Sequence, residues 1–125
     1  MTPSKPAAPK GGAAKPTIYR LAFEDAALAE WKKLDGSVKE LLRKMLKKRL
    51  EAPRVAGAEL HGQLVDCYKI KLRAQGFRLI YQVQDKYLIV LVISVGRRDK
   101  NAVYEAAIKR LKKLTSSNKN SDGDY

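Results

Sequence analysis

The pattern of hydrophobic and polar positions divides the chain into a helical part and a strand part. Apolar residues recur every three or four positions over residues 23–34 and again over 37–52, which predicts two helices. The residues Ser37-Val38-Lys39-Glu40 form a capping-box sequence, so we expect the second helix to begin at Ser37. A run rich in β-branched and aromatic residues at 17–23 predicts a short strand before them. The simplest arrangement of the two helices is an antiparallel hairpin.

After Gly57 the period of the apolar positions falls from 3.6 to 2. Apolar and polar residues alternate over 68–73 and over 77–83, which predicts a β-hairpin with its turn at 74–76. If the apolar residues of both strands share one face, Lys71 must lie opposite Arg78. Residues 87–95 are apolar at nearly every position, which is typical of a strand that is buried on both faces.

Helical spacing returns over residues 101–114, so the expected order of elements is β-α-α-β-β-β-α. We therefore predict an α+β fold in which a small antiparallel sheet packs against the N-terminal helical hairpin, with a C-terminal helix. The folded domain is expected to span 17–114. Residues 1–16 are rich in Pro, Ala, Gly and Lys and predict a disordered basic arm, and residues 115–125 predict a disordered polar tail.

Charge narrows the range of expected partners. The 125 residues include 26 Lys and Arg against 13 Asp and Glu, a net charge of +13 that attracts polyanions, nucleic acid first among them. A single histidine, His61, and a single cysteine, Cys67, offer neither a zinc cluster nor an internal disulfide. The longest apolar run is far shorter than the ~20 residues that span a bilayer. We therefore expect a cytoplasmic protein that needs no metal or cofactor and contacts no membrane.

Positive charge gathers on one face of the predicted hairpin. Lys69, Lys71, Arg73 and Arg78 alternate with the apolar residues, so they share this face at roughly 5 Å from one another across the strands. Crowding of like charges lowers a lysine pKa and makes the amine a better base. The same cations can bind a phosphate and stabilise a pentavalent transition state. A solvated surface without function is the alternative, and alternation does not decide between them.

Two further features could contribute to RNA binding. The helix over 37–52 is basic on its polar side and could contact a phosphate backbone without reading sequence, or it could simply be a soluble amphipathic helix. Tyr104 either belongs to the core, because Ile108 and Leu111 follow at helical spacing, or presents an exposed ring that stacks on a base. The residues expected to bind RNA are Arg73, Lys39, Arg43, Lys44, Lys47, Lys48 and Lys100.

The second half of the chain resembles a known family. The run DCYKIKLRAQGFRLIYQV at 66–83, followed by ISVGRRDKNAVYEAAIKRL at 93–111, is similar to the RelE branch of the RelE/ParE toxin superfamily, and the resemblance extends over about 17–114. It implies a metal-independent endoribonuclease that cleaves mRNA in the ribosomal A site by attack of a ribose 2′-hydroxyl and so inhibits translation. It also implies a cognate RelB-like antitoxin that is acidic or amphipathic.

Five functional positions of the family match residues of this sequence. They are the two lysines after Cys-Tyr (Lys69 and Lys71), the arginine after Gly-aromatic (Arg78), the second basic residue after Val-Gly (Arg98) and the tyrosine of the last helix (Tyr104). Together with the hairpin register, the resemblance implies that Lys71 is the general base and that Lys69 supports it. Arg78 would hold the scissile phosphate, and Tyr104 would stack on or orient a substrate base. Arg98 would protonate or stabilise the leaving 5′-oxygen, and its high intrinsic pKa favours stabilisation.

Two other functions are compatible with the same sequence. One is that of a ParE-like toxin, which shares the fold, targets DNA gyrase and is not a nuclease. The other is that of a noncatalytic basic module that binds RNA or the ribosome, for which the charge of the domain would suffice.

Overall fold

The computed structural model describes residues 18–98 and 101–124, with side chains described as far as Leu114. The elements are β1 (Arg20–Phe23), α1 (Asp25–Lys32), α2 (Gly36–Glu51), the 3-10 turn η1 (Gly62–Leu64), β2 (Cys67–Leu72), β3 (Phe77–Gln84), β4 (Ile89–Arg97) and α3 (Ala102–Asp124). The predicted order and the α+β class are confirmed. The arm expected at 1–16 lies outside the described residues.

The four strands form one sheet in the order β1-β4-β3-β2. The hairpin register is confirmed, since β2 and β3 are antiparallel with Lys71 opposite Arg78. Strand β4 is also antiparallel to β3, but β1 runs parallel to β4, so the sheet is mixed where an antiparallel one was expected. The chain leaves β1 through two helices and the hairpin before β4 returns beside it, and a crossover of that length allows the parallel direction.

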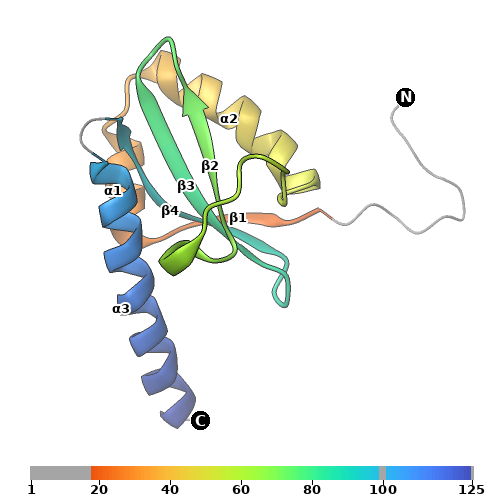
Figure 1. Cartoon of the computed structure of the whole chain (residues 1–125), viewed down its shortest axis with the longest axis vertical. Helices are drawn as coiled ribbons and strands as arrows, with labels where there is room; N and C mark the ends of the chain where they lie inside the picture. The colour runs from red at the N-terminus through yellow and green to blue at the C-terminus, as the bar shows by residue number, and fades with distance from the viewer. Residues whose placement is uncertain (1–17, 99–100, 125) are drawn as a thin grey trace, which may run out of the picture.

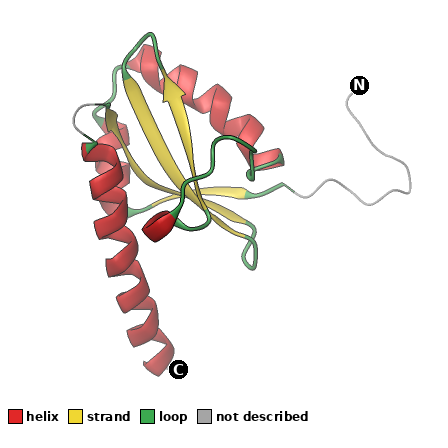
Figure 2. Cartoon of the chain, viewed as in Figure 1, coloured by secondary structure: helices red, strands yellow, loops and turns green. Residues whose placement is uncertain are grey.

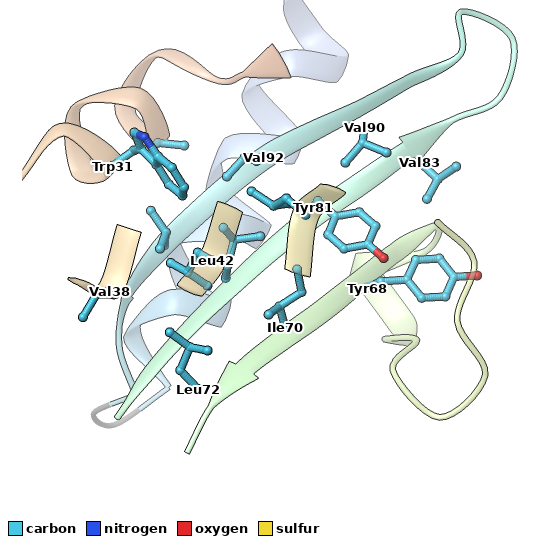
Figure 3. Packing of buried hydrophobic residues seen from close by; sticks show 14 residues of the cluster. Trp31, Val38, Leu42, Tyr68, Ile70, Leu72, Tyr81, Val83, Val90 and Val92 are labelled. Atoms are coloured by element: carbon cyan, nitrogen blue, oxygen red, sulfur yellow. The ribbon is translucent and has the colours of Figure 1, made fainter. Parts of the chain in front are cut away.

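Helices cover both faces of the sheet (Figures 1 and 2). On one face, α1 and α2 pack on the strands to form the larger core, which Figure 3 shows from close by. Its fully buried members include Leu42, Leu46, Ile70, Leu79, Tyr81, Val90 and Val92. On the other face, α3 buries Val103, Ala107 and Leu111 against Leu64, Cys67, Ile80 and Ile93. Strand β4 is therefore buried on both faces, as its apolar run predicted.

Some element boundaries differ from those expected. Helix α2 begins at Gly36, and its N-cap is Asp35, whose carboxylate accepts a hydrogen bond from the Ser37 amide at 3.1 Å. The prediction that Ser37 caps this helix is wrong. Asp35, a residue type equally suited to the N-cap position, lies two residues earlier, and its carboxylate also accepts a hydrogen bond from the Ser37 hydroxyl. Strand β4 begins later than expected because residues 85–88 form a turn with Leu88 at φ 55°. Helix α3 continues beyond residue 114 to Asp124.

Candidate active site

Strand alternation places two lysines and an arginine on the α3 side of the sheet. The side chains of Tyr68, Ile70 and Leu72 point into the α1–α2 core, so Lys69 and Lys71 point the other way. Arg78 lies directly opposite Lys71 and points the same way. Helix α3 packs mainly on β4 and β3, and the side chains of Lys69, Lys71 and Arg78 remain half-buried beside it. Arg73, expected in the strand, is exposed in the turn that follows β2, near enough for its charge to act on Lys71. We call Lys69, Lys71, Arg73 and Arg78 the basic shelf.

Helix α3 contributes an aromatic ring to the basic shelf. The guanidinium carbon of Arg78 lies over the Tyr104 ring, 5.2 Å from its centroid. Tyr104 is half-buried and packs against the α3 core, so its ring is neither wholly core nor wholly exposed. The Nε atom of Arg78 is buried, and no group among the described residues accepts a hydrogen bond from it. The ring thus orients a guanidinium that retains a free donor.

The charges of the basic shelf act on the protonation of Lys71. Its pKa is lowered, first by the positive charge of Lys69, then by partial desolvation, and then by the charges of Arg78 and Arg73. This is the direction expected from crowded cations. A lower pKa increases the fraction of neutral amine at a given pH, and the neutral amine is the form that accepts a proton.

Arg98 follows β4 next to the hairpin turn. Its side chain is exposed, and its backbone amide donates to the Gly76 carbonyl at 3.0 Å. This bond holds the end of β4 beside the turn that joins β2 to β3. Lys100, expected to bind RNA, lies outside the described residues.

The basic residues of α2 do not join the basic shelf. Arg43, Lys44, Lys47 and Lys48 are exposed and Lys39 is half-buried, but α2 covers the opposite face of the sheet. Arg43 also forms an ion pair with Glu40 at 2.6 Å. The two basic regions expected to bind RNA, the polar side of α2 and the basic shelf, therefore lie on opposite faces of the sheet.

Two side chains near the shelf were missed by the sequence argument. Arg49 looked like its basic neighbours, yet it is half-buried and donates to the Tyr81 hydroxyl at 2.7 Å and to the Lys69 carbonyl at 3.3 Å. It therefore links α2 to the backbone of β2.

Ser94 is the second of these side chains, and it is fully buried under α3. Its signal was available, as a hydroxyl inside the apolar run YLIVLVISV.

The described residues form neither a metal-binding cluster nor a membrane-spanning helix. Within 18–98 and 101–124, no three His, Cys, Asp or Glu side chains are grouped where a metal ion could be held. Across the same ranges, no helix is both long and apolar enough to cross a membrane. His61 is exposed at the start of η1.

Comparison with known sequences places the chain in a family. The model of the family described as ParE toxin of type II toxin-antitoxin system, parDE, matches residues 21–102. The mRNA interferase toxin RelE of Escherichia coli strain K12 is 50% identical over 93 residues, which cover 74% of this chain and 97% of that protein. The mRNA interferase RelE of Shigella flexneri matches with the same identity and coverage.

Solved structures agree with the sequence comparison. A mutant of the E. coli toxin RelE in the free state superposes with a TM-score of 0.69 at 49% identity, covering 74% of this chain and 97% of that one. RelE in the intact E. coli RelBE toxin-antitoxin complex superposes with a TM-score of 0.63 at 50% identity, covering 66% and 99%. The protein therefore belongs to the ParE toxin family of type II toxin-antitoxin systems and, within that family, to the RelE-type toxins.

Proposed function

We propose that this RelE-type toxin is a metal-independent endoribonuclease that cleaves mRNA in the ribosomal A site and thereby inhibits translation. The observation that carries the proposal is the position of Lys71 opposite Arg78, whose guanidinium lies over Tyr104. Identity of 50% to relatives named mRNA interferase supports the same activity. Lysine and arginine can bind a phosphate and neutralise its charge without a metal ion.

The proposed reaction is a transesterification within the RNA chain. Neutral Lys71 accepts the proton of a ribose 2′-hydroxyl through its Nζ atom. The 2′-oxygen then forms a bond to the adjacent phosphorus, and the bond from phosphorus to the 5′-oxygen breaks. The products are a 2′,3′-cyclic phosphate and a 5′-hydroxyl whose oxygen takes a proton from solvent. Arg98 stabilises the charge on that oxygen, because a guanidinium is too weak an acid to donate its own proton readily.

The other members of the site stabilise charge and orient the substrate. The positive charge of Lys69 lowers the pKa of Lys71 and so favours its basic form. Arg78 binds the scissile phosphate and stabilises its transition-state charge through its guanidinium group. Tyr104 stacks on a substrate base.

The ribosome provides the positioning that this set of side chains lacks. The site includes no histidine, whose ordinary pKa suits acid–base catalysis near neutrality, so free RNA is a poor substrate. The basic side of α2 binds ribosomal RNA phosphates, while the basic shelf binds mRNA. The E. coli RelBE complex supports a RelB-like antitoxin as the inhibitory partner, and the cytoplasm is the compartment where ribosomes and such a partner meet.

The test is to map the ends of mRNA cut on ribosomes that hold a defined codon in the A site. We expect new ends within that codon, with a 5′-hydroxyl on one fragment and a 2′,3′-cyclic phosphate on the other. Arg78→Ala should lower the single-turnover rate by about 100-fold or more, since it removes the main phosphate contact. Arg97→Ala is a matched control, because Arg97 is an exposed arginine stacked on Phe77 on the opposite face.

Three results would contradict the proposal. Intact mRNA together with gyrase inhibition would identify a ParE-like activity. Ribosome binding without cleavage would identify a noncatalytic module. Equal losses in Arg78→Ala and Arg97→Ala would mean that the basic shelf is not the site of cleavage.

A further inference from the structure

Strand β4 contains one extra residue opposite β3. Ile80 pairs with Ser94 and Tyr81 pairs with Val92, so Ile93 is the additional residue of a β-bulge. In a regular strand, neighbouring side chains point to opposite faces. At this bulge the consecutive residues Ile93 and Ser94 both point to the α3 side. Ile93 packs in the α3 core, and the Ser94 hydroxyl donates to the Val103 carbonyl. Bulges re-aim side chains in this way, often next to active sites.

The Ser94 hydroxyl makes a directional contact with the start of α3. Ser94 is 1% exposed, and its hydroxyl donates to the Val103 carbonyl at 2.8 Å. Val103 is the residue before Tyr104. A buried hydroxyl is costly without a partner, so this bond specifies where the first turn of α3 lies on the sheet.

Arg110 makes a second contact with the bulge, farther along α3. Its Nη1 donates to the Ile93 carbonyl at 2.9 Å. The same guanidinium forms a two-point pair with the Glu30 carboxylate of α1, at 2.8 and 2.9 Å. Glu30 in turn accepts a bond from the Val95 amide of β4 at 3.2 Å. Helix α3 is therefore attached to the bulge on both sides of Tyr104 in sequence.

We propose that the β4 bulge, Ser94 and Arg110 form a positioning device that holds α3 where the Tyr104 ring lies over the Arg78 guanidinium. The apolar contacts of Val103, Ala107 and Leu111 hold α3 to the sheet but are not directional, so they would tolerate a small rotation or shift. The hydrogen bonds from the bulge are directional and select one position. The geometric part of this inference is independent of the proposed function. Only the expected effect of the helix position on mRNA cleavage rests on that function.

The geometric part is tested by NMR of the Arg78 Nε–Hε group in the full-length protein. The Tyr104 ring current displaces this proton signal, so Tyr104→Ala should move it. Ser94→Ala and Arg110→Met should move it in the same direction, because the ring leaves its place. Val38→Ala is the control, since it creates a cavity in the core on the opposite face and destabilises the fold without touching α3.

A wild-type Arg78 signal in both Ser94→Ala and Arg110→Met would overturn the proposal. An equal displacement in Val38→Ala would also overturn it, because the effect would then reflect general destabilisation. If the Arg78 signal does not respond to Tyr104→Ala, the ring does not lie over the guanidinium, and the proposal is overturned as well.

The catalytic part is tested by single-turnover cleavage on saturated ribosomes. Ser94→Ala should lower the rate by about 10-fold, because small misplacements of a catalytic group are costly, and should leave ribosome affinity unchanged. The Ser94→Ala, Tyr104→Ala double variant should cleave no more slowly than Tyr104→Ala alone. Additive losses would overturn positioning through Tyr104. Normal cleavage by Tyr104→Ala, with the NMR displacements present, would contradict the proposed role of Tyr104 and leave the positioning device intact.

Discussion

Lys71 and Arg78 lie directly opposite each other in the β2–β3 ladder, and both side chains point to the face that α3 covers only in part. The pair is crowded by Lys69 from the same strand, which has the largest effect on the pKa of Lys71. The lowered pKa makes the neutral amine of Lys71 easier to reach than that of an isolated lysine.

The first prediction concerns the pH dependence of cleavage. The single-turnover rate should rise with pH and level off above the lowered pKa of Lys71, because the neutral amine accumulates as pH rises through that value. Lys71→Arg keeps the positive charge but cannot become neutral, so its rate should fall by about 100-fold or more. Rates on saturated ribosomes at several pH values measure both effects.

Lys69→Ala provides the matched comparison. It removes the largest cause of the lowered pKa of Lys71, so the rise in rate should shift to higher pH. If the midpoint of the pH profile in Lys69→Ala equals that of the wild type, Lys71 is not the group that titrates.

The second prediction separates binding by α2 from cleavage on the opposite face. Replacing Lys44 and Lys47 with alanine should weaken ribosome binding and reduce the dependence of log affinity on log salt by about 1 to 2, since each lysine contributes at most one phosphate contact. The single-turnover rate on saturated ribosomes should stay within about twofold of the wild type, because these exposed residues lie away from the basic shelf. A large loss of rate at saturation would contradict the separation of the two faces.

The third prediction compares two ion pairs of different burial. The Arg110–Glu30 pair has side-chain exposures of 18% and 34%, whereas the Arg43–Glu40 pair has 57% and 62%. Double-mutant cycles on the free energy of unfolding, measured in urea, should give a coupling of about 1.5–3 kcal/mol for the first pair. The exposed pair should give about 0.5 kcal/mol or less. Equal coupling energies would mean that burial does not strengthen the α1–α3 contact.

The fourth prediction concerns the reactivity of Cys67. Burial raises the pKa of its thiol to about 12, so the native protein should hold it protonated and inaccessible at pH 8. A disulfide reagent such as DTNB should react with it slowly in buffer and rapidly in denaturant. In Val65→Cys the added thiol replaces a side chain that is 66% exposed and should react at once. Equal rates for the two thiols would contradict the buried position of Cys67.

Several features could be predicted because they depend on neighbours close in sequence. The alternation at 68–83 and the need to bury one face determined the pairing of Lys71 with Arg78. The same alternation predicted that Lys69, Lys71 and Arg78 share a face. The apolar run of β4 predicted burial on both sides, which α1 and α2 on one face and α3 on the other provide.

Other features depend on contacts between segments far apart in the chain. The parallel pairing of β1 with β4 joins residues almost 70 positions apart, and no local pattern encodes its direction. The bulge at Ile93 required knowledge of the β3 register, and the partners of Ser94 and Arg110 required the place of α3.

The sequence by itself determined the elements, the hairpin register and the cations that share a face with Arg78, because periodicity and the burial of one face act locally. Only the tertiary structure decided that Tyr104 lies over Arg78, that α2 covers the opposite face, and that the bulge holds α3. The physical reason is that these relationships arise from the packing of whole helices on a sheet, where hydrogen bonds between distant residues select one arrangement among several that bury the same apolar surface.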